Sequence, residues 1–153
     1  MVIKEKYCHL IDVHILIIED GKLLLLKRKD SLNKEYDGLW HLPSGKLEYG
    51  EDASTGAARE LAEETDIRLD AENLTLSNVV HTNQSGNIAR LGMFFVCDTA
   101  RKLLPKNAEP DKCYEIKWFK LDELPNDIVP YTLLGIENYI SKNVYSNNFV
   151  TKK

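Results

Sequence analysis

One helix-forming stretch, residues 52–65, constrains the fold most because its two faces need different surroundings. Residues three or four apart share a helix face. One face carries small apolar residues suited to close packing against a sheet, namely Ala57, Ala58, Leu61 and Ala62. The other face carries three carboxylates within a single turn, Glu60, Glu63 and Glu64. The chain therefore needs a sheet beneath this helix.

The three carboxylates repel one another, at a cost of a few tenths of a kcal/mol for each like-charged pair. A hard divalent ion with oxygen ligands would remove this cost, and magnesium or manganese fits best. Bound magnesium usually keeps several waters and is shared with substrate phosphates. The alternative interpretation is a solvated acidic face, which is common on surface helices.

The residues around the cluster resemble the Nudix box, which reads Gly-x5-Glu-x7-Arg-Glu-U-x-Glu-Glu-x-Gly-U with U aliphatic. Over residues 45–67, eight of its nine specified positions match: Gly45, Glu51, Arg59, Glu60, Leu61, Glu63, Glu64 and Ile67. The exception is Asp66, where the family has glycine. This position follows the expected helix end, where a left-handed conformation is common and aspartate is less comfortable than glycine. Ser44 also replaces the first glycine of a frequent Pro-Gly-Gly.

The resemblance implies an α+β fold, the Nudix α/β/α sandwich with a mixed central β-sheet, formed by one domain over residues 1–153. It implies metal ligation by Glu60, Glu63, Glu64 and the carbonyl of Gly45, with Mg²⁺ as the cofactor and Mn²⁺ as an alternative. One carboxylate, by resemblance Glu60, could instead deprotonate the attacking water. Arg59 is expected to hold acidic side chains in place as part of the catalytic set.

Four further residues are candidates for the site. Lys46 and Arg28 are candidate phosphate contacts, although Arg28 could equally be a surface charge. Glu115, on an expected strand, is a tentative further metal ligand, with an exposed strand glutamate as the alternative. Glu109, in the preceding loop, is a weaker candidate of the same kind. The four histidines show no ligand spacing and are expected to be structural, unless His41 lines the pocket.

The substrate class follows from resemblance to the MutT-type members of the family, carried by residues 107–113 and by Trp118 and Phe119. These enzymes convert nucleoside triphosphates, some of them modified, to monophosphate and pyrophosphate. ADP-ribose, nucleotide sugars and other nucleoside diphosphate derivatives are the alternative. No proline lies between Pro43 and Pro105, where ADP-ribose hydrolases usually carry one. A non-catalytic nucleotide-binding module and an RNA pyrophosphohydrolase are less favoured.

Composition agrees with one soluble cytoplasmic enzyme domain, and the resemblance implies a small-molecule nucleotide as its partner. The net charge of −4 disfavours nucleic acid as a partner. The longest apolar runs are strand-sized, which argues against a membrane span, and the N-terminus lacks a signal-peptide pattern. The three cysteines have no paired spacing and are interpreted as reduced thiols. The oligomeric state stays open, although homodimers are common among such proteins.

The remaining pattern predicts alternating strands and a closing helix. Residues 13–18 and 23–28 flank Asp20-Gly21, a strong hairpin signal. Residues 74–81 and 91–97 read as strands around a turn near 85–87, and residues 114–119 as another strand. Residues 29–40 predict a polar loop. Residues 131–141 predict a helix with four inward side chains, Leu133, Leu134, Ile136 and Ile140.

Overall fold

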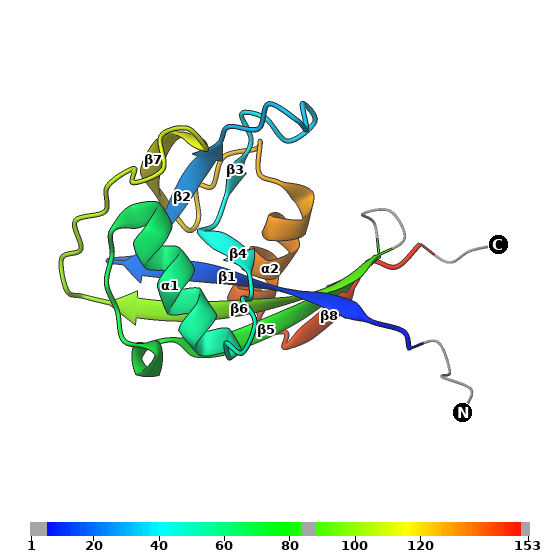
Figure 1. The fold of residues 1–153 in the computed structure, drawn as a ribbon. Coiled ribbons are helices and arrows are strands. Elements are labelled where there is room, and N and C mark those ends of the chain that lie inside the picture. The colour runs from blue at the N-terminus through cyan, green and yellow to red at the C-terminus, as the bar shows by residue number, and fades with distance from the viewer. Residues whose placement is uncertain (1–5, 84–87, 151–153) are drawn as a thin grey trace.

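The computed structural model describes residues 6–83 and 88–150, which form eight strands, two α-helices and one 3₁₀ turn (Figure 1). The strands expected from the sequence are present: the one expected at 74–81 is shifted by one residue, and the others have wider bounds, most of all the first. The turn expected near 85–87 lies outside the described residues. In chain order the elements are β1 His9–Glu19, β2 Lys22–Arg28, β3 Trp40–His41, β4 Ser44–Lys46, α1 Ala53–Thr65, η1 Ala71–Asn73, β5 Thr75–Thr82, β6 Ala89–Thr99, β7 Cys113–Lys120, α2 Pro130–Ser141 and β8 Tyr145–Asn147.

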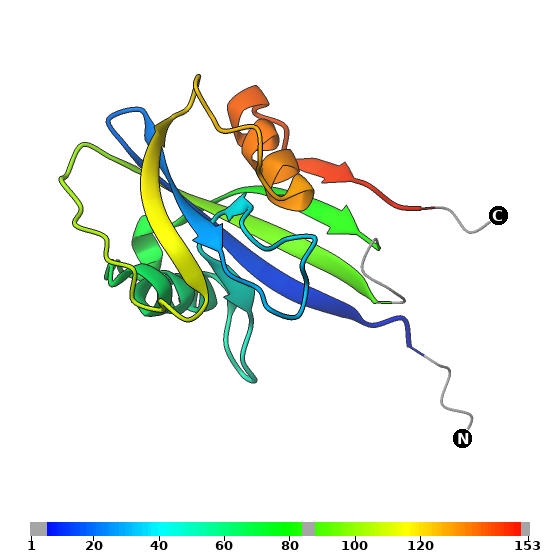
Figure 2. The same ribbon diagram turned by 90° about the horizontal axis from the view of Figure 1, so that it is seen from above.

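A mixed sheet forms the middle layer of the molecule. Its strand order is β3-β2-β1-β6-β5-β8, with β4 added beside β1 and β7 beside β2. β1 runs parallel to β6 and antiparallel to β2 and β4. Helix α1 covers one face of the sheet and α2 the other, as the two views show (Figures 1 and 2). The expected α+β sandwich with a mixed central sheet is confirmed.

Strand β1 supplies both hydrophobic cores because its side chains alternate between the two faces. Val13, Ile15 and Ile17 pack with the α1 residues Ala57 and Leu61, and all five are fully buried. Leu16 and Ile18 point the other way, into the cluster that contains Ile136 of α2. A strand buried on both faces reads as an apolar run, which is how this segment appears in the sequence.

The hairpin between β1 and β2 is confirmed. The pairing Glu19↔Lys22 leaves a two-residue loop of Asp20 and Gly21, whose φ angles are 48° and 75°. Two positive φ values in a two-residue loop match the turn twist that antiparallel strands prefer. The short strands β3 and β4, by contrast, were not predicted, since two or three residues are too few to show a period.

Both ends of α1 are fixed by aspartates. The Asp52 carboxylate accepts a hydrogen bond from the backbone N–H of Thr55 at 3.1 Å, which caps the first turn. Asp66 ends the helix with φ 59° and ψ 13°, in the left-handed region, and its N–H bonds to the carbonyl of Ala62. The left-handed helix end considered from the sequence is therefore present, with aspartate in the place of glycine.

Helix α2 packs differently from the prediction at one position. Ile136 is buried as expected, but Ile140 is 52% exposed, so its inward assignment was wrong. The inward face is instead completed by Gly135, which leaves room for the Phe94 ring, and by Asn138. The Asn138 side chain donates to the side-chain oxygen of Asn78 at 3.2 Å, so a polar residue is satisfied in the core.

No helix in residues 6–83 and 88–150 is long and apolar enough to cross a membrane.

Candidate functional site

The site begins where strand β4 meets helix α1. Gly45 pairs with Val13 of β1 and faces the same side of the sheet as that residue, toward α1. A Cβ atom at position 45 would lie 2.1 Å from the carboxyl carbon of Glu60. The backbone of Gly45 does not have a positive φ. Glycine is therefore favoured here because a side chain would collide with Glu60, not because of the backbone conformation. The carboxylate of Glu60 rests directly against the backbone of β4.

Arg59 orders the acidic side chains around it. Its Nε and Nη2 atoms donate to the two carboxylate oxygens of Glu51, at 2.7 and 2.9 Å. Its Nη1 donates to Glu60 at 3.0 Å and to Glu63 at 3.2 Å. Nη2 also donates to the carbonyl of Lys46 at 3.1 Å, which ties α1 to the end of β4. One planar guanidinium thus fixes three carboxylates and a strand.

Glu64 is the most buried of the helix carboxylates. Its two oxygens accept from the backbone N–H of Ser44 at 3.3 and 3.4 Å. Burial raises the pKa of Glu64 well above its ordinary value, and the negative charges of Glu60 and Glu109 raise it further. Burial also raises the pKa of Glu60, more than the neighbouring Arg59 lowers it. This is a site with an excess of negative charge removed from water, which a cation would neutralise.

The carboxylates do not form a finished cage around an ion. Among the residues that the structure describes, no three His, Cys, Asp or Glu side chains converge in a metal-binding arrangement. The reason is visible in the contacts, because Glu60 and Glu63 turn toward Arg59 and Glu64 turns toward Ser44. The residues nevertheless fit a divalent cation in chemistry, because they are hard oxygen donors on one helix face and burial raises the pKa values of Glu60 and Glu64.

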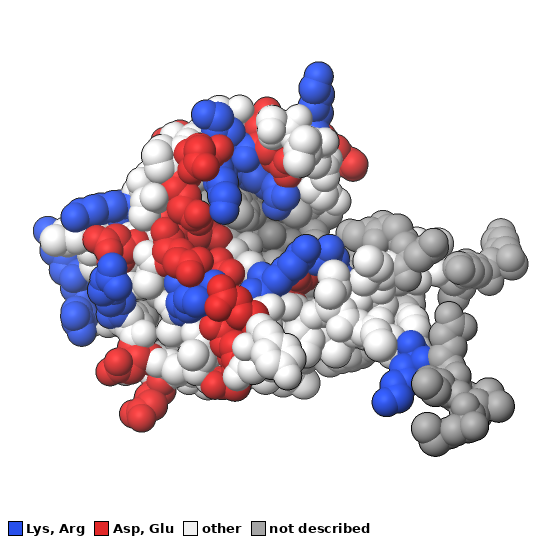
Figure 3. All heavy atoms as spheres, in the orientation of Figure 1, with Lys and Arg blue, Asp and Glu red and all other residues white. Residues whose placement is uncertain are grey.

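Figure 3 shows Asp and Glu side chains in a band over α1, with Lys and Arg side chains on both sides. Of the two further acidic candidates, Glu109 faces this band, since its charge raises the pKa of both Glu60 and Glu64. Glu115 lies on β7 in register with Lys27 and is exposed. Its charge acts on Cys113 instead.

The two candidate phosphate contacts lie at the margins of the site. Lys46 follows Gly45 on β4 and pairs with Asp12, so its side chain points to the opposite face of that strand. Arg28, at the end of β2, bonds to Asp30 with its Nη2 at 2.6 Å from the carboxylate. His41 on β3 is nearby and partly buried, and desolvation together with the charge of Arg28 lowers its pKa to about 4.

A second polar group of residues lies on the α2 side of the sheet and was not anticipated. Arg90 on β6 donates to both oxygens of Asp12 on β1, at 3.0 and 3.2 Å. His14 stacks on Phe94 with ring centroids 4.4 Å apart, and burial lowers its pKa to about 3. Asp12 and His14 interrupt an otherwise apolar strand, and that interruption was the available sequence signal.

This second group contains polar atoms that are buried without a partner. Within the described residues, both ring nitrogens of His14, the Nε of Arg90 and the hydroxyl of Tyr131 make no hydrogen bond. The Tyr131 hydroxyl fills the space over Gly92, where a Cβ would lie 1.8 Å from it. Buried polar groups are normally paired, so this patch is suited to a ligand that supplies donors and acceptors.

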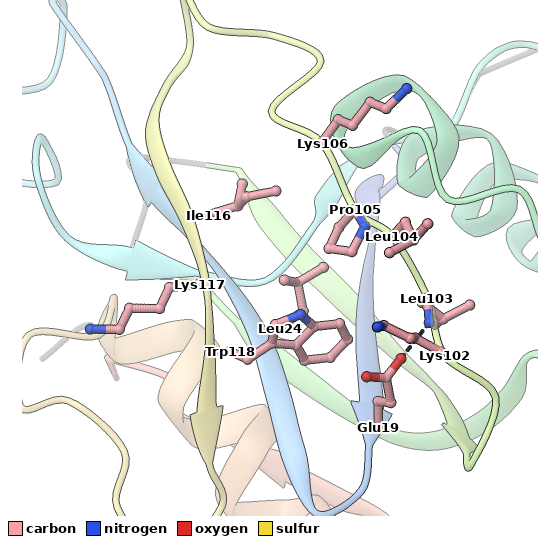
Figure 4. A pocket seen from close by; sticks show the side chains of 10 residues that line it. All are labelled: Glu19, Leu24, Lys102, Leu103, Leu104, Pro105, Lys106, Ile116, Lys117 and Trp118. Atoms are coloured by element: carbon pink, nitrogen blue, oxygen red, sulfur yellow. Dashed lines mark hydrogen bonds between the residues drawn. The ribbon is translucent and has the colours of Figure 1, made fainter.

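A separate cavity of about 550 Å³ opens between β7 and the segment after β6 (Figure 4). Leu24, Trp118 and Pro105 form apolar walls, and the backbone N–H of Leu103 donates to the Glu19 carboxylate at its edge. None of the acidic residues of α1 lines it. The cavity is therefore distinct from the carboxylate site.

The domain is a sandwich in which a mixed sheet lies between two helices. Its acidic centre consists of α1 carboxylates that Arg59 holds beside Gly45 of β4. The particular family follows from comparison with known proteins. The NUDIX domain model matches residues 9–134, and the chain belongs to that family.

Proteins similar to this chain are named as Nudix hydrolases or MutT-like proteins. A MutT-like protein from Streptomyces ambofaciens is 44% identical over 61 residues, which cover 40% of this chain and 36% of that protein. Nudix hydrolase 5 from Arabidopsis thaliana is 27% identical over 113 residues, covering 74% of this chain and 36% of the relative. The chain thus spans about a third of the length of these relatives. The crystal structure of a MutT NUDIX hydrolase from Burkholderia pseudomallei superposes with TM-score 0.74 and 30% identity, covering 85% of this chain and 97% of that one.

Proposed function

We propose that this chain is a divalent-metal-dependent pyrophosphohydrolase that cleaves a nucleoside triphosphate to the monophosphate and pyrophosphate. The observation that carries the proposal is the pair of partly buried carboxylates, Glu60 and Glu64, on the face of α1 beside Gly45, where burial raises the pKa of both. Membership in the NUDIX domain family and the structural similarity to a MutT NUDIX hydrolase support it.

Phosphoanhydride hydrolysis needs neutralisation of phosphate charge and an oriented water. We assign ligation of Mg²⁺, or of Mn²⁺ in its place, to Glu60, Glu63, Glu64 and the carbonyl of Gly45. When bound, the ion supplies charge neutralisation and a lowered pKa for water. Arg59 is the positioning residue, because it holds Glu60 and Glu63 at fixed distances from β4. As the alternative to ligation, Glu60, whose pKa is raised, would accept a proton from the attacking water.

The nucleoside is assigned to the opposite side of β4, next to Tyr131. The α2-side patch offers a ring edge, a hydroxyl and two imidazole nitrogens that lack hydrogen-bond partners in the described structure. Lys46 lies on this face of β4, adjacent to Gly45. We therefore assign to it a contact with phosphates that lie between the carboxylate site and the α2-side patch. Replacing Tyr131 with Phe should raise KM several-fold with little change in kcat, because the hydroxyl would touch only the base or sugar.

The test is a reaction with a panel of dNTPs, ADP-ribose and a nucleotide sugar in oxygen-18 water with magnesium. We expect monophosphate and pyrophosphate from a triphosphate, with the label located by mass spectrometry in one of the two. Orthophosphate as the primary product would contradict the proposal. Rapid cleavage of ADP-ribose or of a nucleotide sugar with no turnover of triphosphates would favour the diphosphate-derivative alternative. Saturable nucleotide binding without any cleavage would favour a binding module.

A further inference from the structure

Two histidines meet at the end of the sheet that extends beyond α1. His9 lies near the start of β1 and His81 near the end of β5, on either side of β6. Their Nε2 atoms are 2.8 Å apart, and their ring centroids 4.9 Å. Ala89 on β6 is in register with His9 and is 2% exposed. The small Ala89 side chain leaves room for the His9 ring to lean across β6 toward His81, whose own register partner on β6 is Leu91.

We propose that the facing Nε2 atoms of His9 and His81 form a binding site for a late first-row divalent metal ion, with Zn²⁺ as the type ion, separate from the acidic site on α1. Neutral imidazole nitrogen is a preferred ligand of such ions, whereas magnesium prefers oxygen. The site supplies two protein ligands, and water completes the coordination.

Zinc binding requires the two Nε2 atoms to move apart. Two nitrogens bound tetrahedrally to one zinc ion at about 2.0–2.1 Å are separated by about 3.3 Å. The Nε2 atoms must therefore part by roughly half an ångström, and χ rotations must turn both rings so that their lone pairs converge on the ion. As the pair stands, one Nε2 must carry a proton and the other a lone pair, because two lone pairs would repel at this distance. Metal binding would require His9 to change tautomer, its proton moving from Nε2 to Nδ1 by exchange with water, so that both Nε2 atoms become ligands and both imidazoles stay neutral.

The surroundings of His81 resemble those of a metal-bound histidine. The Tyr145 hydroxyl lies 3.5 Å from its Nδ1, so it can accept from the Nδ1–H and keep the lone pair on Nε2. The ring of Phe149 packs edge-on against it, with centroids 4.4 Å apart. Burial and the neighbouring His9 both lower the pKa of His81, which favours the neutral form that binds metal.

The experiment measures Zn²⁺ uptake by the full chain in excess Mg²⁺, which occupies the oxygen site, by equilibrium dialysis. We expect one Zn²⁺ per chain for wild type and at least tenfold weaker binding for His9→Gln and for His81→Gln. Glu63→Gln is the matched control and should bind this Zn²⁺ as wild type does. Nitrogen-15 spectra of the imidazoles should show both Nε2 signals shifting on Zn²⁺ addition. Hydrolysis in Mg²⁺ should be unchanged in both histidine variants.

No Zn²⁺ uptake by wild type would overturn the proposal and leave the pair as a hydrogen bond only. Equal uptake by wild type and both histidine variants would also overturn it, because the ion would then be held elsewhere. His9→Gln keeps the test valid if His81→Gln fails to fold, since His9 lies at the beginning of β1.

Discussion

The carboxylate of Glu60 occupies the space that a side chain at position 45 would need, with 2.1 Å between its carboxyl carbon and a Cβ built on Gly45. Helix α1 and strand β4 therefore pack in direct contact at this point. Because the neighbour is the far end of a flexible side chain, a substitution would displace the carboxylate more readily than it would unfold the protein.

Gly45→Ala should lower turnover by about a hundredfold or more, because displacement of a catalytic group by about 1 Å has that scale of effect. The free energy of unfolding should change by less than about 1.5 kcal/mol. Ser44→Ala is the control, since the Ser44 contact to Glu64 is made by the backbone N–H. Steady-state rates and thermal melts of both variants test this prediction. Equal activity in the two variants would show that a side chain at position 45 does not disturb the site.

Glu63→Gln or Glu64→Gln should reduce turnover by at least about a hundredfold while the fold survives, because an amide balances a divalent ion less well than a carboxylate does. Turnover is measured at saturating magnesium, and folding by circular dichroism. Wild-type rates in the double variant would remove both residues from the metal site.

Glu64 should also set a pH dependence of stability in the metal-free protein. Its folded pKa lies above the ordinary 4.5, so folding takes up a proton between these values and the stability falls as pH rises through that window. Glu64→Gln lacks this titration. In EDTA, the variant should therefore gain in melting temperature relative to wild type as pH increases from about 4.5 to neutrality. A constant difference over that range would show that the carboxylate is not buried in solution.

Arg59→Lys should lower turnover by about tenfold or more, because an ammonium cannot reproduce the planar set of contacts to Glu51, Glu60 and Glu63. Glu51→Gln should act through the same network. The double variant should consequently lose much less than the product of the two single effects. Fully multiplicative losses would indicate that the two residues act independently.

Asp66→Gly should stabilise the fold by up to about 1 kcal/mol, because glycine adopts the left-handed region without a side-chain clash. The exposed contacts from Arg68 at 3.1 Å and Lys106 at 3.7 Å would be lost, at little cost. Lys142 ends α2 with the same φ of 59°, so Lys142→Gly is a matched comparison. Chemical denaturation measures both; a clear loss confined to Asp66→Gly would mean that its ion pairs outweigh the backbone strain.

Local patterns in the sequence were sufficient for the hairpin at Asp20-Gly21 and for α1, because turn chemistry and a 3.6-residue period are short-range properties. The contact between Gly45 and Glu60 joins residues fifteen positions apart, and the box resemblance pointed to both without giving their distance. The inward placement of Ile140 failed because a helix face depends on its neighbours. Phe94 fills the space beside Gly135, and Asn78 provides a partner for Asn138.

The α2-side patch could not be assembled from sequence for a similar reason. Asp12 and Arg90 are 78 positions apart and meet only because β1 and β6 are parallel neighbours. Pairing between distant strands is decided by the topology of the whole sheet, which no local window contains.

Strand β4 separates the two sides of the molecule. Gly45 faces the carboxylates on the α1 side, and Ser44 and Lys46 face the α2 side. Since side chains alternate, a slip of one residue would bring the side chain of Ser44 or Lys46 against Glu60 and turn the glycine to the other face. Insertions and deletions should therefore be rare in residues 43–46 among related sequences. The polar loop after β2 carries no such constraint, so changes of length should accumulate there instead.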